Sequence, residues 1–193
     1  YTVEPAQDGE RTVELRRSGE SKLIAAAYHT SAFADKDYAA LDALNEILAS
    51  NPSGYLYKAL VESHKVSSLS AYSPTVRDAG LTYFNFDVPK DKDLQVTKTA
   101  VLSELDKIPT INYTEQDLAR AKSKLLKQID DEKNNTIRYA ISLTEIIGAG
   151  SYKLGFLYRD NVEHLSVADI KRVAEKYFRN NNRTVGLFIP SAN

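Results

Sequence analysis

The stretch Lys22–Thr30, with the sequence KLIAAAYHT, is almost continuously apolar. A run of this length and composition is typical of a β-strand near the middle of a sheet. The segment before it, Thr12–Arg17, alternates Val13 and Leu15 with charged or polar neighbours, which predicts a strand with one buried face. The residues between them, Ser18–Glu20, favour a turn. The two strands are therefore predicted to pair as a hairpin.

Two helices and two strands are expected next along the chain. Asp35–Ala49 carries apolar residues at spacings of three and four, the pattern of an amphipathic helix that Asp35 could cap. A shorter helix is predicted from Ser53 to Glu62. Strands are predicted at Ser67–Ser73 and Leu81–Val88, with a loop between them.

The C-terminal half is predicted to be helical until one last strand. Apolar spacing and cap residues predict helices at Asp91–Ile108, Thr114–Lys133, Thr136–Ile147, Tyr152–Tyr158 and Ser166–Phe178, and a strand at Arg183–Ile189. Because hairpins rather than crossover helices join the strands, the order predicts an α+β fold. The expected architecture is a two-layer sandwich, with an antiparallel or mixed sheet and helices packed on one face.

Composition excludes several functional classes. The chain has 193 residues, with 25 basic and 26 acidic side chains, so no strong field is expected that would favour nucleic acid. It has no cysteine, which removes disulfides and thiol chemistry. No apolar run of membrane-spanning length occurs, and no membrane partner is expected. One domain, residues 1–193, is predicted, excised from a longer chain because the sequence contains no methionine.

The histidines do not have the spacing of a zinc peptidase site. They lie at positions 29, 64 and 164, so neither HExxH nor HxxEH occurs. Glu62 and His64 are two residues apart, a spacing that directs side chains away from each other on a helix. His29 is expected to be satisfied within its strand and His164 to be solvated. No GxSxG or phosphate-binding glycine motif occurs either, so the predicted catalytic, cofactor-binding and metal-binding residues are none.

Four strings carry a resemblance to a known family. They are YTVEPAQDGERTV at 1–13, AYH at 27–29, PSGYLYKALVE at 52–62 and NRTVGLFIP at 182–190. In this order they resemble the pitrilysin/insulinase family of zinc metallopeptidases, over essentially the whole chain. The likeness is to the non-catalytic second domain, which follows the zinc-binding domain in bacterial members.

The resemblance implies an α+β sandwich that pairs with related domains to enclose a peptide-degrading chamber. In the family, an HxxEH helix and a distal glutamate hold zinc, and the glutamate of the motif activates water; this chain has no such motif. Active members also carry an arginine and a tyrosine seven residues apart in the far half. Val61 and Ser68 stand at those positions, which implies the partner of the zinc-binding domain rather than the substrate-clamping domain.

The expected function is therefore that of a non-catalytic, chamber-forming domain of a zinc metalloendopeptidase. Zinc is implied for the catalytic domain of the parent protein, and the chain alone is predicted to be inactive. Its expected partner is the neighbouring zinc-binding domain or a partner subunit, and peptide substrate could touch it in the full enzyme. A bacterial, periplasmic location is implied by the resemblance. The residues expected to shape the fold are Tyr28, Ala25–Ala27, Gly54, Leu56 and Leu60.

Two alternatives remain open from the sequence. An inactive, stand-alone interaction or scaffold protein of the same fold would have the same residues and would also lack the motif. A hydrolase with an unrecognised site is the other alternative, because a linear sequence does not exclude polar side chains that converge in space.

Overall fold

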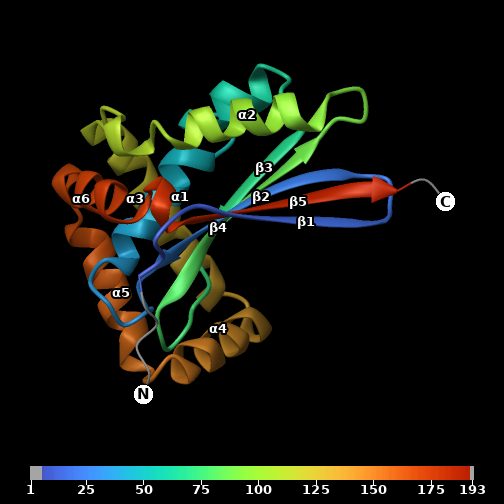
Figure 1. Cartoon of the computed structure of the whole chain (residues 1–193). Coiled ribbons are helices and arrows are strands. Elements are labelled where there is room, and N and C mark those ends of the chain that lie inside the picture. Colours follow the sequence, from blue (N-terminus) through green and yellow to red (C-terminus); the bar gives the residue numbers. More distant parts are fainter. Residues whose placement is uncertain (1–5, 192–193) are drawn as a thin grey trace.

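A computed structural model describes residues 6–191 and shows a sheet covered by helices (Figure 1). The strands of this described part are β1 (Arg11–Ser18), β2 (Lys22–Thr30), β3 (Ser68–Tyr72), β4 (Gly80–Val88) and β5 (Arg183–Ser191). They form one sheet in the order β1-β5-β2-β4-β3. β5 runs parallel to β1, and the other neighbouring strands are antiparallel, so the sheet is mixed.

Helices and short helical turns make up the second layer. They are α1 (Tyr38–Ala49), α2 (Leu94–Leu105), α3 (Glu115–Lys133), α4 (Thr136–Gly148), α5 (Lys153–His164) and α6 (Val167–Tyr177), with a π-helical turn η1 (Tyr57–Glu62) and the 3₁₀ turns η2 (Ile108–Thr110) and η3 (Asn180–Asn182). Thr114 and Asp117 form a capping box before α3, and Ser166 and Asp169 form a second one before α6.

One face of the sheet packs on the helices, as predicted. The strand register places Ile24, Phe86 and Leu187 side by side on this face, and all three are buried. Leu60 of η1 has 0% exposure and belongs to the same core cluster. The two-layer architecture is therefore confirmed.

The predicted β1–β2 hairpin is wrong, because β5 lies between the two strands and bonds to both. β2 is the most apolar strand, and it gains hydrogen-bonded neighbours on both sides from β5 and β4. All eight residues of β1 are exposed, which also corrects the prediction of one buried face. The ends of β1, β5 and β2 beside the β1–β2 turn project beyond the helices in Figure 1.

Several predicted boundaries and roles also need correction. Asp35 does not cap α1, which begins after Asp37; instead its Oδ1 accepts the backbone N–H of Asp37 at 2.8 Å. The predicted short helix at Tyr152–Tyr158 continues to His164. Of the alanine run in β2, only Ala26 faces the helices, because side chains alternate along a strand; Ala25 and Ala27 lie on the other face.

Gly54 shapes the turn between α1 and η1, as predicted. A Cβ atom at this position would lie 2.5 Å from the carbonyl oxygen of Leu48 and 2.8 Å from the backbone nitrogen of Ser50. Such distances are too short for any side chain, and the clash would be with backbone atoms. The turn can therefore approach the end of α1 only because residue 54 is glycine.

Candidate functional site

The three histidines do not come together. His29 lies on β2, His64 follows η1 with a left-handed φ of 57°, and His164 is the last residue of α5. The Nδ1 atom of His164 lies 2.7 Å from the carbonyl oxygen of Asp160. Within residues 6–191, no group of three histidine, aspartate or glutamate side chains could hold a metal ion. The described residues therefore do not fit the zinc of the family's catalytic domain.

Val61 and Ser68 lie where the resemblance would place the substrate-binding arginine and tyrosine of an active far half. Val61 is half-buried in η1 and packs against the core. Ser68 opens β3, and its hydroxyl donates to the carboxylate of Asp87. Neither side chain can provide a guanidinium or a phenol to a substrate. The first five residues of the N-terminal string that carries the resemblance lie outside the described residues.

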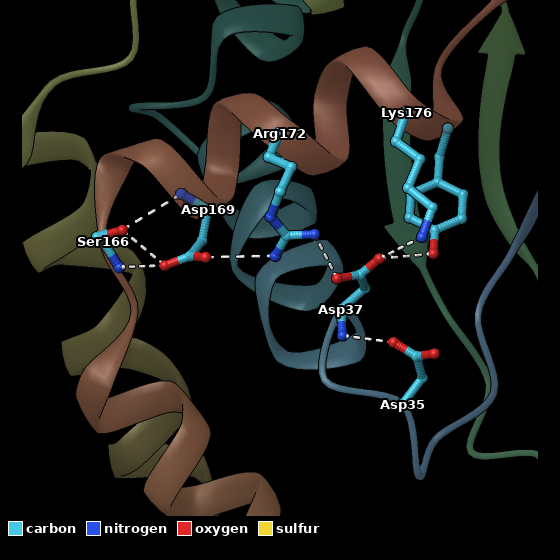
Figure 2. Close-up of polar contacts among 7 residues, drawn as sticks. Asp35, Asp37, Ser166, Asp169, Arg172 and Lys176 are labelled. Carbon is cyan, nitrogen blue, oxygen red and sulfur yellow. Dashed lines mark hydrogen bonds and ion pairs between the residues drawn. The ribbon is translucent and has the colours of Figure 1, made fainter.

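The most buried carboxylate, Asp37, is held by three donors (Figure 2). Its side chain has 0% exposure and accepts hydrogen bonds from Arg172, from Lys176 Nζ at 2.7 Å and from Tyr177 Oη at 2.8 Å. Burial raises the pKa of Asp37, but these hydrogen bonds outweigh it and lower the pKa to about 2. Because every donor comes from α6 and its end, the contact joins α6 to the start of α1.

Arg183 forms a second buried ionic network. Its guanidinium donates to Glu10 Oε2 at 2.7 Å, to Asp106 Oδ1 at 2.8 Å and to Tyr28 Oη at 3.2 Å. Burial raises the pKa of Tyr28 to about 12, so its hydroxyl stays protonated at neutral pH. Both networks satisfy their charges internally. They act as structural joints and leave no group free for chemistry.

A groove of about 830 Å³ lies between α3, α4 and α5 and reaches α1. An aromatic trio forms one end of it, with ring centroids 4.8 Å apart for Phe33 and Tyr38 and 5.7 Å apart for Phe33 and Tyr158. Ile141 of α4 and Phe156 of α5 line its sides. A volume of this size lies within the range of sites that bind ligands or protein segments.

The wall helix α4 is apolar but unburied. Within the described chain none of its residues is buried, although it carries Ile137, Ile141, Ile146 and Ile147. Ile137 is 73% exposed, and Phe156 on the neighbouring α5 is 65% exposed. An apolar helix of this kind is normally covered, and a cluster of exposed apolar side chains marks a protein interaction surface. Figure 1 shows α4 at the periphery of the helical layer.

Asp42 places a carboxylate at the aromatic end of the groove. It lies on α1, lines the groove, and accepts a hydrogen bond from the hydroxyl of Tyr158. Burial, together with the nearby charge of Glu46, raises the pKa of Asp42 to about 6, although the Tyr158 bond opposes this. In contrast to Asp37, no cation pairs with Asp42 among residues 6–191.

Sequence reasoning did not identify this groove. Phe156 is more than 100 residues from Phe33 and Asp42 along the chain and meets them only in the fold. One signal was present in the sequence, because Thr136–Gly148 carries a wide apolar face that includes Ile137, Ile141 and Ile147. Among residues 6–191, no helix is both long and apolar enough to cross a membrane.

Comparison with known proteins gives consistent matches. The family model described as the peptidase M16 inactive domain matches residues 1–125. The zinc protease PqqE of Helicobacter pylori is 25% identical over 198 residues, which cover 98% of this chain and 43% of that protein. The chain therefore spans less than half the length of this curated relative.

Solved structures show the same fold. The inactive peptidase domain of a predicted zinc protease from Bordetella parapertussis is 32% identical, with a TM-score of 0.83 over 93% of this chain and 96% of that one. A protease structure from Helicobacter pylori has a TM-score of 0.88 at 23% identity and covers 98% of this chain and 46% of that one. At that identity the second match supports the fold alone.

Proposed function

Because the chain belongs to the peptidase M16 inactive-domain family, we propose that it serves as the non-catalytic, chamber-forming domain of a zinc metalloendopeptidase. This is the pitrilysin/insulinase family that the four sequence strings resemble. The observation that carries the proposal is the match to an inactive domain over residues 1–125. The dispersed histidines support it, because the described residues do not fit a zinc site.

In this role the chain performs no chemistry and supports the domain that does. The zinc-binding domain would hold the metal, and the bound zinc would lower the pKa of its water and polarise the scissile carbonyl. This chain would supply a wall of the chamber and a rigid support for the catalytic helix. The Asp37 and Arg183 networks suit such a role, because each fixes a helix against a distant part of the chain.

The first test uses the chain alone. After dialysis against zinc, mass spectrometry should find far less zinc than protein, and a quenched-fluorescence peptide should stay uncleaved. Stoichiometric zinc that is lost when His29, His64 or His164 is substituted would overturn the proposal. Peptide cleavage by the chain alone would do the same, and would favour a hydrolase with its own site.

The second test adds the zinc-binding chain, defined as the polypeptide with an HxxEH motif encoded in the same reading frame or by the adjacent gene. The two chains should form a complex in size-exclusion chromatography with light scattering, and only the complex should cleave the peptide efficiently. If the zinc-binding chain were equally active without this chain, the supporting role would be wrong. A complex with no effect on hydrolysis would favour the scaffold alternative.

We also propose a bacterial, periplasmic location, which rests on the family resemblance alone. Fractionation of cells that express the full-length parent gene tests it. The protein should be released with the periplasmic contents by osmotic shock, and recovery only with the cytoplasm would contradict the location.

A further inference from the structure

Among the described residues, the groove between α3, α4 and α5 has more unpaired acidic side chains than unpaired basic ones. Three carboxylates line it, from Asp42, Glu132 and Glu145, and within residues 6–191 none of them has an ion-pair partner. The charge of Glu132 helps to raise the pKa of Tyr158, and the charge of Glu145 helps to raise the pKa of Tyr38. Both tyrosine rings lie beside Asp42. The two glutamates therefore act on the same aromatic cluster that contacts Asp42.

The basic side chains of the groove are mostly engaged elsewhere. Arg159 Nη1 pairs with Asp130 at 2.7 Å, and its Nε pairs with Glu163 at 3.0 Å. Lys133 Nζ lies 3.5 Å from the same Asp130. Arg138 also lines the groove, so one of its basic groups is not held by a carboxylate. The unpaired side chains of the groove therefore carry a net negative charge. Ile141 and Phe156 line the groove beside them and are called its apolar rim.

We propose that this groove binds an apolar segment of the zinc-binding chain that carries a lysine or arginine, whose cationic group pairs with Asp42. The inference rests on the proposed function, since it names where the catalytic partner docks. The apolar part of the segment would cover Ile141 and Phe156, and the cation would reach Asp42 at the aromatic end of the groove. Charge complementarity thus selects the occupant, and the apolar rim provides the contact area.

The carboxylate of Asp42 is better suited to binding a partner's cation than to stabilising the fold. Burial without a cation raises its pKa, so the folded chain gains nothing from the charge at neutral pH, in contrast to Asp37. An incoming ammonium or guanidinium would provide the missing partner. Within the complex, Asp42 would be a desolvated charge with one specific partner, the kind of contact whose loss strongly weakens binding.

The test measures binding of the zinc-binding chain by isothermal titration calorimetry. Asp42→Asn keeps the shape of the side chain and removes its charge, and it should weaken binding by more than about tenfold. Asp160→Asn removes a carboxylate from the exposed face of α5 and should bind as the unsubstituted chain does. Melting curves followed by circular dichroism should be similar for both variants, which separates lost binding from lost folding.

A second pair of variants tests the apolar rim. Ile141→Glu places a charge in the groove wall and should abolish binding, whereas Val96→Glu, at an exposed apolar position on α2, should not. A double-mutant cycle then tests the ion pair. Overlapping peptides of the zinc-binding chain identify the docking segment, and its lysine or arginine is changed to glutamine. This change should add little to the effect of Asp42→Asn, because both remove one interaction.

The outcomes are distinguishable from failure of the proposed function. If the unsubstituted chain forms no complex, the proposed function fails. If the complex forms and cleaves peptide but Asp42→Asn and Ile141→Glu bind normally, only the docking inference is wrong. The chain alone could instead form a dimer that Ile141→Glu abolishes. This result would assign the groove to a second copy of the chain and would also overturn the docking inference.

Discussion

The contribution of the Asp37 charge to the stability of the fold can be predicted in numbers. Its buried carboxylate receives hydrogen bonds from Arg172, Lys176 and Tyr177, and its pKa falls from 3.8 to about 2 (Figure 2). A pKa that is lower in the folded state than in the unfolded state means that the ionised form stabilises the fold. Since one pKa unit corresponds to about 1.4 kcal/mol, Asp37 should contribute about 2 kcal/mol at neutral pH.

The sign sets the pH window in which this contribution disappears. It is fully present above the unfolded pKa of 3.8 and is lost as the pH falls through the folded value of about 2. By about pH 3, roughly half of it should be gone. Asp37→Asn should therefore lower the free energy of unfolding by about 2 to 3 kcal/mol at neutral pH. Arg172 and Lys176 are partly exposed and can be hydrated after the substitution, which limits the loss.

Urea unfolding followed by circular dichroism at about pH 7 and about pH 3 measures both quantities. The gap between the unsubstituted chain and Asp37→Asn should shrink by about half at the lower pH. Asp160→Asn, at an exposed position, should unfold with the unsubstituted chain at both pH values. A stabilising role for the Asp37 charge is refuted if Asp37→Asn keeps the original urea midpoint at neutral pH, or if the two chains differ equally at both pH values.

Three further substitutions test the packing, the turn and the caps. Leu60→Ala should lower the free energy of unfolding by about 2 to 5 kcal/mol. Leu157→Ala, at a 53% exposed position, should lower it by less than about 0.5 kcal/mol. An unchanged melting curve for Leu60→Ala would contradict the placement of Leu60 in the core. Gly54→Ala should destabilise by more than about 1 kcal/mol because of the 2.5 Å approach to Leu48, while Gly148→Ala, with open space around it, should be neutral or stabilising in thermal melts. Thr114→Ala should cost about 1 kcal/mol through loss of the α3 cap, and Thr99→Ala, inside α2, should not; equal urea midpoints for the two would exclude the cap as the cause.

The elements that the sequence predicts well are those specified by local chemistry. Thr114 and Ser166 each stand three residues before an aspartate, and both pairs form the capping boxes that their spacing predicts. In β2, by contrast, the nearly continuous apolar run predicts a central strand but not which of its side chains enter the core. Strand pairing is different, because β5 reaches its place between β1 and β2 from the far end of the chain. A turn signal at Gly19 specifies a reversal of the chain but not which strand becomes the neighbour.

The difference between local sequence signals and contacts between distant segments also explains which features of the site are predictable. A zinc motif is local, so three widely separated histidines suffice to predict that no such helix exists here. The groove depends on Phe33 and Asp42 meeting α4 and α5 in space, and no spacing in the sequence describes that. The apolar pattern of Thr136–Gly148 correctly predicts a helix. It does not predict that within the described chain this helix packs no side chain fully into the core.

That difference between helix formation and burial supports a docking role for α4. An isolated helix of this length is marginal in water, and most helices in proteins are stabilised by covering their apolar face. α4 carries a wide apolar face, yet α3 and α5 cover only part of it. Selection for solubility alone would favour polar residues at positions such as Ile141 and Ile147. Their apolar character is explained if another polypeptide covers them, and Asp42 specifies that this polypeptide brings a positive charge.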